Sequence, residues 1–245
     1  MNRELQISRN IEFVQEQIAQ ACSRAQRSLD AVKLVAVTKT KPAEDVLAAI
    51  KAGITDFGEN RIEEASGKIP LVNQHVDEPV TWHMIGHIQS RKARDIVPLF
   101  NTVHSIDSMK IAQKLSSLAV EHGKTLKIFA EVNISGEEQK DGFKVSKWRT
   151  DVQQFESFQQ TIQTLAKLPS LELVGLMTMA PFVDDPELTR PVFANMAALR
   201  SELESKLHLQ IPHLSMGMTN DYRVAIEEGA TVVRIGTAIF GERNT

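Results

Sequence analysis

Residues 34–60 read LVAVTKTKPAEDVLAAIKAGITDFGEN. The run at 34–39 is apolar and rich in β-branched residues, which indicates a buried β-strand. Pro42 stands where the first turn of a helix favours proline, and Gly53 marks the end of that helix. A weak second strand follows at 56–59. Buried strands joined by a helical crossover predict a parallel sheet with helices packed outside it.

The same alternation continues along the chain. Strands are predicted at residues 34–39, 56–59, 81–86, 102–107, 127–133, 173–179, 213–218 and 231–236. Helices are predicted within 5–28 and at 42–53, 91–99, 108–123, 155–168, 186–207 and 220–229, with Pro98 cutting the third of them short. Irregular stretches are expected around 67–80 and 135–147.

Eight strand–helix units in this length favour an α/β fold, a single (β/α)8 TIM barrel. An open doubly wound sheet is the alternative, but its first strand–helix turn is usually rich in glycine, and residues 38–42 hold none. We expect one domain over residues 1–245, with residues 1–30 as an N-terminal helix packed on the barrel.

Composition excludes several classes of protein. The 245 residues carry 28 Lys plus Arg against 31 Asp plus Glu, a formal net charge of −3, which argues against a generic nucleic-acid coat or a basic membrane-surface protein. The one cysteine, Cys22, excludes an internal disulfide and a cysteine-built zinc site. No signal-peptide core and no run near the ~18 apolar residues of a membrane span is found, so a cytoplasmic protein is expected.

Polar residues gather where the predicted strands end, which is the active face of a barrel. They are Lys39, Asn60, His83, Asn133, Ser215, Gly217, Arg234, Gly236 and Thr237. Asn60 and Asn133 suit either a ligand ring or backbone hydrogen bonds at a strand end, and His83 suits a satisfied core histidine. No metal site is predicted, because no ligand spacing is shown by His75, His104, His122, His208 and His213.

Lys39 ends an otherwise apolar strand. Loss of hydration there favours the neutral amine and hence nucleophilic attack on a carbonyl. Lys41 has the same side-chain parity, but it precedes Pro42 at a helix start, where residues are usually extended and solvated. Position therefore favours Lys39. The alternative is a snorkelling or ion-paired lysine at the rim.

The last predicted strand leads into a stretch suited to a phosphate. Gly236 permits close backbone approach, Thr237 supplies a hydroxyl, and a short helix over 238–241 would offer free amides. Ser215 and Gly217 arrive from the neighbouring strand end. The alternative is a pair of tight turns with a capping threonine. A lysine and a phosphate cradle together suggest either a Schiff-base aldolase acting on a sugar phosphate or a pyridoxal 5′-phosphate (PLP) protein.

Arg234 follows buried valines, so its guanidinium needs an acceptor. If it meets a pyridine nitrogen, that nitrogen stays unprotonated and the ring becomes a poor electron sink. A structural salt bridge is the alternative.

Six motifs then carry a resemblance to a known family. They stand at 36–42 (AVTKTKP), 57–60 (FGEN), 82–92 (WHMIGHIQSRK), 175–177 (GLM), 214–221 (LSMGMTND) and 233–241 (VRIGTAIFG). In this order they resemble the pyridoxal phosphate homeostasis proteins, over about residues 32–243. The resemblance implies a barrel like the N-terminal domain of bacterial alanine racemase.

The family's site residues carry over position by position. The resemblance implies PLP held as a Schiff base on Lys39, phosphate held by Ser215, Gly236 and Thr237, and Arg234 near the pyridine nitrogen. Family members usually have proline or a similar residue where His87 stands, a departure that bears on loop shape and touches no chemical group.

The leading interpretation is a PLP-binding protein of vitamin B6 homeostasis and amino-acid balance, with no catalytic residue assigned. Apo PLP-dependent enzymes are the candidate recipients, and the family habit is a monomer or weak dimer. An amino-acid racemase is the alternative. It needs a second acid/base opposite Lys39, and the one tyrosine, Tyr222, is predicted on the seventh strand–helix loop. An aldolase without PLP and an interaction-only protein are further alternatives.

Overall fold

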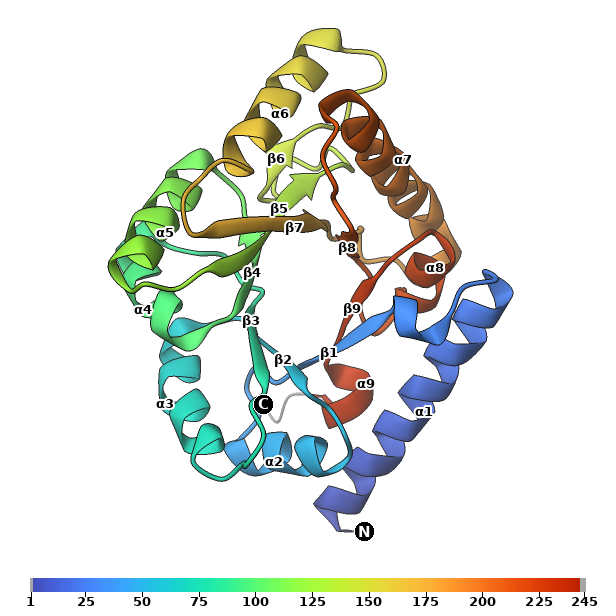
Figure 1. The fold of residues 1–245 in the computed structure, drawn as a ribbon. Helices are drawn as coiled ribbons and strands as arrows, with labels where there is room; N and C mark the ends of the chain where they lie inside the picture. Colours follow the sequence, from blue (N-terminus) through green and yellow to red (C-terminus); the bar gives the residue numbers. More distant parts are fainter. Residues whose placement is uncertain (1, 243–245) are drawn as a thin grey trace.

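A computed structural model describes residues 2–242 of the chain. Its centre is a closed parallel barrel, seen end-on in Figure 1. The eight barrel strands are β1 (Lys33–Val37), β2 (Asp56–Glu59), β3 (Thr81–Met84), β4 (Thr102–Ile106), β5 (Leu126–Asn133), β7 (Leu171–Met177), β8 (His213–Ser215) and β9 (Val232–Ile235). The prediction of eight barrel strands is confirmed, although several end about two residues earlier than expected.

Neighbouring strands pair in parallel around the ring. The order is β4-β3-β2-β1-β9-β8-β7-β5, and the β4–β5 pairing closes it. The first and last strands lie side by side, with Ala36 opposite Ile235. A two-residue strand, β6 (Phe143–Lys144), pairs with β5 outside the ring. Closure of the ring excludes the open doubly wound sheet.

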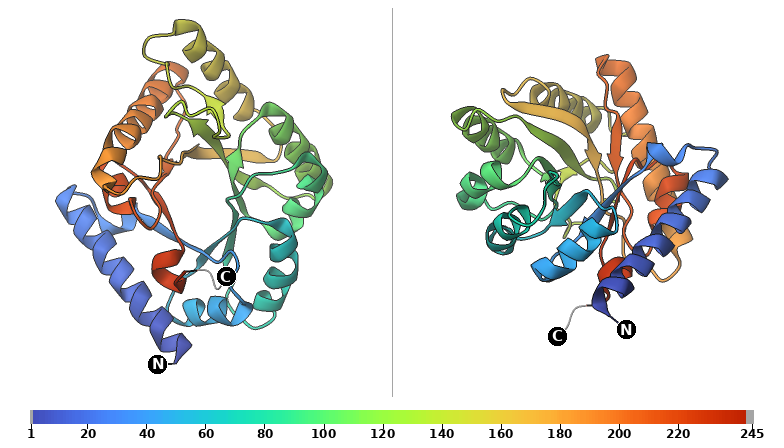
Figure 2. Two further views of the ribbon diagram at one scale, coloured as in Figure 1. Left: turned by 180° about the vertical axis from the view of Figure 1, so that it is seen from behind. Right: turned by 60° about the horizontal axis from the view of Figure 1, so that its bottom comes forward.

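Helices surround the barrel in a single layer (Figures 1 and 2). They are α1 (Arg3–Arg24), α2 (Ala43–Lys51), α3 (Ile62–Asn73), α4 (Ala93–Leu99), α5 (Met109–Glu121), α6 (Val152–Leu165), α7 (Arg190–Leu207), α8 (Tyr222–Glu227) and α9 (Thr237–Phe240). Short 3-10 turns, η1 (Leu29–Ala31), η2 (Ser90–Lys92) and η3 (Pro186–Thr189), precede β1, α4 and α7.

Helix α3 corrects the expectation of an irregular stretch beginning at residue 67. Its buried residues include Ile62, Ala65, Ile69 and Val72, whose spacings of three and four place them on one face. Pro70 lies inside the helix, so packing of that face against the barrel outweighs the local cost of the proline. Pro98 likewise lies within α4, which continues to Leu99.

Helix α1 packs along the outside of the barrel, beside the chain's last elements (Figure 2). Ile7, Ile11, Val14 and Ile18 form its buried stripe. Asn10 Nδ2 donates to the Ile239 carbonyl in α9 over 2.8 Å. The two ends of the described chain are therefore joined by packing and hydrogen bonds. No helix among residues 2–242 is long and apolar enough to cross a membrane.

Candidate functional site

A pocket of about 470 Å³ opens at the carboxyl ends of the barrel strands, within the roughly 300–1,000 Å³ of small-molecule sites. Five of the seven predicted cofactor residues line it: Lys39, Asn60, Arg234, Gly236 and Thr237. They come from the segments after β1 and β2, from β9, and from the segment after β9. The topology therefore brings together residues that lie as far as 198 positions apart.

Lys39 lies in a tight turn that directly follows β1. The Lys41 amide donates to the Thr38 carbonyl over 3.0 Å and closes the turn. Thr40 adopts a φ of 63°, a left-handed conformation that is unfavourable for a β-branched residue. Its amide donates to Glu64 Oε1 over 2.6 Å, so a helix side chain holds the strained residue in place.

A buried lysine, Lys68 of α3, stabilises this turn through hydrogen bonds. Its ammonium donates to the Thr38 carbonyl over 2.7 Å, to Glu59 Oε1 over 2.7 Å and to Glu64 Oε1 over 2.6 Å. Thr38 Oγ1 also donates to Glu59 Oε1, over 2.6 Å. Sequence reasoning missed Lys68 because α3 was not predicted; on a recognised helix, its spacing of four from Glu64 would have indicated a pair.

The two candidate lysines differ in their surroundings. Lys41 also lines the pocket, but its ammonium donates to the Glu242 carbonyl over 2.8 Å. Burial lowers the pKa of Lys41, with a further contribution from the charge of Arg3. Lys39 is half-buried, on the turn that Lys68 fixes.

The predicted phosphate segment lies beside β1. A Cβ on Gly236 would stand 3.1 Å from the Val37 carbonyl oxygen, so a side chain there would crowd the adjacent strand. The helix after it begins at Thr237, one residue before the predicted start, and has four residues. Thr219 Oγ1 accepts from the Ala238 amide over 3.4 Å. In so short a helix, individual N–H and hydroxyl groups matter more than a helix dipole.

Ser215 and Gly217 are not among the residues that line this pocket. The Ser215 side chain is fully buried, and its Cα is level with Met177 and Val232 in the neighbouring strands. Gly217 has a φ of 94°, and a Cβ there would lie 2.7 Å from that of Ala225. Binding of phosphate by these two residues stays a prediction, and the geometry gives each a structural role as well.

Ser215 belongs to a hydrogen-bonded chain that crosses the barrel interior. Arg234 Nη1 donates to Ser215 Oγ over 2.5 Å, and Ser215 Oγ donates to His104 Nδ1 over 2.8 Å, since the Asp56 carboxylate at the other end of the chain can only accept. His104 Nε2 then donates to His83 Nδ1 over 2.9 Å. His83 Nε2 donates to Asp56 Oδ1 over 3.0 Å. The donors all run in one direction, from guanidinium to carboxylate.

The pKa shifts of the two histidines and of Asp56 agree with this direction of hydrogen-bond donation. Burial lowers the pKa of His83 and lowers that of His104 well below its usual range, so both rings are neutral at pH 7. Burial raises the pKa of Asp56, but hydrogen bonds from His83 and Lys33 lower it by more, so that the resulting pKa is about 2. His83 is thus a core histidine with both ring nitrogens hydrogen-bonded, as the sequence suggested.

Arg234 is the end of this chain that reaches the pocket. Its Nη2 also donates to the Thr178 carbonyl, over 3.1 Å. Burial lowers its pKa to about 10, against the favourable charges of Glu131 and Asp221, so it remains a cation at pH 7. A guanidinium held here can donate to an acceptor in the pocket and cannot give that acceptor a full proton.

Asn133 and Tyr222 do not line the pocket. Asn133 Nδ2 donates to the carbonyls of Glu137 (2.7 Å) and Lys140 (3.1 Å), and its Oδ1 accepts from the Gly136 amide (2.9 Å). It therefore organises the loop after β5, in line with the backbone-bonding alternative. Tyr222 is buried at the start of α8, and a Cβ on Gly217 would lie 2.9 Å from its Cα.

Comparison with known proteins supplies the family. The family model described as alanine racemase, N-terminal domain, matches residues 14–244. A pyridoxal phosphate homeostasis protein of Vibrio alginolyticus is 41% identical over 239 residues, covering 97% of this chain and 98% of the relative. The chain belongs to the pyridoxal phosphate homeostasis protein family.

Solved structures agree with this membership. PipY of Synechococcus elongatus, a structure with PLP bound, has a TM-score of 0.78 and 32% identity, covering 93% of this chain and 100% of that one. An alanine racemase of Clostridium difficile shares the fold, with a TM-score of 0.71 and 17% identity, covering 96% of this chain and 57% of that one. The predicted family and barrel fold are confirmed.

Proposed function

We propose that this member of the family binds PLP and takes part in intracellular PLP homeostasis. The observation that carries the proposal is one pocket shared by a lysine on a fixed turn, a buried arginine, and a glycine–threonine segment. These groups fit PLP chemically. An amine suits its aldehyde, a guanidinium suits its ring nitrogen, and hydroxyl and amide donors suit its phosphate.

Each residue has a distinct part in the proposed site. Lys39 would hold the aldehyde carbon of PLP through a C=N bond, a Schiff base formed with release of water. Arg234 donates to the ring nitrogen, with its orientation set by Ser215 and Thr178. Gly236 and Thr237 hold the phosphate, and Asn60 lies beside the ring. The cofactor, when bound, supplies electron-withdrawing chemistry that an unprotonated ring nitrogen keeps weak.

The attachment is tested by borohydride reduction of PLP-loaded protein, followed by peptide mass spectrometry. Reduction converts the C=N bond to a stable secondary amine, and we expect the pyridoxyl group on the Lys39 peptide. Lys39→Ala should lose the label and the associated absorbance band. Lys41→Ala, the matched control, should keep both. Label confined to Lys41, or an unlabelled parent protein, would contradict the proposal.

An amino-acid racemase is the alternative from a different class. The cationic Arg234 disfavours it, because a neutral ring nitrogen stabilises a substrate carbanion poorly. We therefore expect negligible loss of chirality and little deuterium uptake at the α-carbon of L-alanine. Turnover on the order of 10 s⁻¹, ordinary for an enzyme, would restore the racemase interpretation.

The proposal also covers the partners of the protein and its location in the cell. We propose a cytoplasmic protein that acts as a monomer or weak dimer and passes PLP to apo PLP-dependent enzymes. The pocket lies at the barrel mouth, where PLP can enter and leave. If PLP reaches an apo-enzyme faster than it is released to solution, the protein delivers PLP directly. Equal rates would show that the protein only stores PLP.

A further inference from the structure

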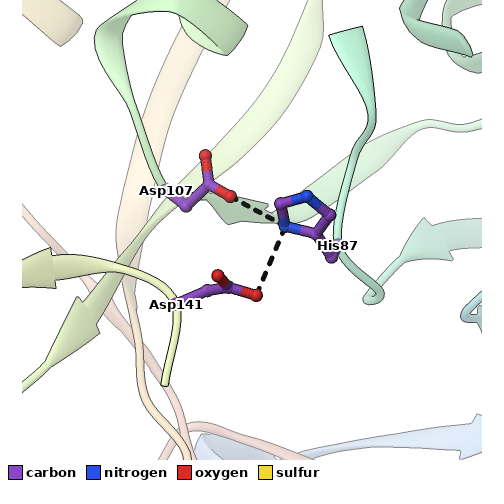
Figure 3. Close-up of side chains that lie close together, drawn as sticks. All are labelled: His87, Asp107 and Asp141. Atoms are coloured by element: carbon purple, nitrogen blue, oxygen red, sulfur yellow. Dashed lines mark ion pairs between the residues drawn. The ribbon is translucent and has the colours of Figure 1, made fainter. Parts of the chain in front are cut away.

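Three side chains converge on the opposite part of the barrel mouth, at the ends of β3, β4 and β5 (Figure 3). His87 follows β3, Asp107 follows β4, and Asp141 lies in the loop between β5 and β6. None of the three lines the PLP pocket. They therefore form a separate group, which the proposed PLP function does not use.

Two of the distances within this group match those between ligands of one metal ion. His87 Nδ1 lies 3.0 Å from Asp107 Oδ2 and 3.3 Å from Asp141 Oδ2. With metal–ligand bonds of about 2.0–2.2 Å, neighbouring ligands stand about 3.0 Å apart in an octahedron and about 3.3 Å apart in a tetrahedron. The ligand atoms of all three residues lie within 4.8 Å of one another.

The backbone holds these residues in place before any ion arrives. Gly86, directly before His87, packs against Asn60 so closely that a Cβ would lie 2.2 Å from the Asn60 carbonyl oxygen. Ser105 Oγ also donates to the Gly86 carbonyl over 2.6 Å. Packing against Asn60 and a hydrogen bond from Ser105 therefore fix the segment that carries His87 against the ends of β2 and β4.

The loop that carries Asp141 is held in a similar way. Gly142 has a φ of 105°, and a Cβ there would lie 2.9 Å from the Glu131 carbonyl oxygen. Asn133 binds the Lys140 carbonyl on the other side of Asp141, as described above. The loops that carry His87 and Asp141 thus both pack against neighbouring backbone, which keeps the conformational cost of binding an ion small.

A third acidic residue, Glu131 of β5, lies beside the loop that carries Asp141, since Gly142 packs against its backbone carbonyl. Its side chain is buried, with 4% of the residue exposed. Burial, followed by the charges of Asp107 and Asp141, raises its pKa to about 7, so its carboxyl group lies within the field of both. Nearby Lys140 is engaged with Glu137. The group itself consists of one imidazole and two carboxylates.

We propose that His87, Asp107 and Asp141 bind a divalent transition-metal ion. An imidazole ligand favours Zn²⁺, Cu²⁺, Fe²⁺ or Ni²⁺ over Mg²⁺ and Ca²⁺, which prefer oxygen. His87 and Asp141 are about half exposed, with side-chain exposures of 53% and 57%, so water can fill the remaining coordination positions. The ion would join the three loops that form this side of the barrel mouth.

Titration calorimetry of tag-free, PLP-free protein with Zn²⁺ tests the site. We expect saturable binding of one ion per chain, at least tenfold weaker binding by His87→Ala and Asp141→Asn, and much weaker binding of Mg²⁺. His75→Ala is the matched control, because His75 is also an exposed histidine but lies outside the group. Its affinity for Zn²⁺ should equal that of the parent.

Co²⁺ provides a second measurement that does not depend on heat. Its visible absorption should report binding by nitrogen and oxygen ligands, and this spectrum should be lost in His87→Ala. Because His87 is exposed, the variant should melt at the same temperature as the metal-free parent, which separates loss of the site from misfolding. Unchanged Zn²⁺ binding in His87→Ala, or no saturable binding by the parent, would show only an ion-pair cluster and overturn the proposal.

Discussion

At the residue scale, Ser215 shows how one hydroxyl links the pocket to the barrel interior. It accepts from Arg234 and donates to His104, so its single hydrogen is already committed. Residue type and position near a strand end both pointed to phosphate binding. They could not reveal that Ser215 is level with Val232, two residues before Arg234, the β9 residue that lines the pocket. Depth along a strand depends on the register with both neighbours, and a single sequence does not state that register.

Glu131 makes the free energy of unfolding depend on pH. Its pKa rises from 4.5 to about 7 on folding, so the folded protein binds more protons than the unfolded chain between these values. The free energy of unfolding should therefore fall as pH rises through this window, by about 3 kcal/mol from this group. Glu131→Gln should remove that loss.

The measurement is chemical unfolding of both proteins at pH 5 and pH 8, with a chelator present. His83 and His104 act in the opposite sense, because their pKa values are lowered on folding. They titrate in both proteins and cancel in the difference. Glu131→Gln should thus gain relative stability between pH 5 and pH 8, and a constant difference would contradict the assignment.

At the element scale, α3 is where sequence reasoning failed most clearly. Gly67 and Pro70 weaken the local preference for a helix, yet the stripe of Ile62, Ala65 and Ile69 gains enough burial to form one. The strands were easier to predict, because continuous apolar runs between helical patterns leave few other structures. Missing α3 also hid Lys68, and with it the reason why the Lys39 turn is rigid.

Lys68→Met should therefore damage both stability and the turn. Glu59 is fully buried, and loss of its cation leaves a buried charge uncompensated, typically at a cost of about 3–5 kcal/mol. Thr40, held in a left-handed conformation, would lose part of its support as well. We expect a lower free energy of unfolding by urea and weaker retention of PLP.

Two controls separate these effects. Lys51→Met removes an exposed partner of Glu4 and should change stability by less than about 1 kcal/mol. Adding Glu59→Gln to Lys68→Met should recover part of the stability, since it removes the unpaired charge. A Lys68→Met protein as stable as the parent would show that the buried pair contributes nothing to the turn.

At the scale of the whole molecule, the proposed site depends on closure of the ring. Lys39 follows the first strand and Thr237 follows the last, and the β1–β9 pairing brings them to one pocket. The order of strands made this meeting predictable from sequence once a barrel was assumed. The His87 group was not predictable in the same way, because Asp141 belongs to an irregular loop whose path depends on Asn133 and Gly142.

Helix α1 tests whether the molecule behaves as one cooperative unit. Ile11 is 1% exposed between α1 and the barrel, and Asn10 binds the α9 backbone next to the proposed phosphate segment. Ile11→Ala should cost about 2–5 kcal/mol through lost burial and a residual cavity. Leu5→Ala, at a residue that is 55% exposed, should stay within about 0.5 kcal/mol of the parent.

Hydrogen exchange decides whether that loss is local or global. If α1 folds with the barrel, Ile11→Ala should speed exchange in α1, β1 and β9 by similar factors, because all three open together. Retention of PLP should fall with them, since Thr237 lies in α9. If α1 were a separate appendage, faster exchange would be confined to residues 3–24 and PLP binding would be unchanged. The hydrogen bonds from Arg3 and Asn10 to the α9 carbonyls favour the coupled outcome.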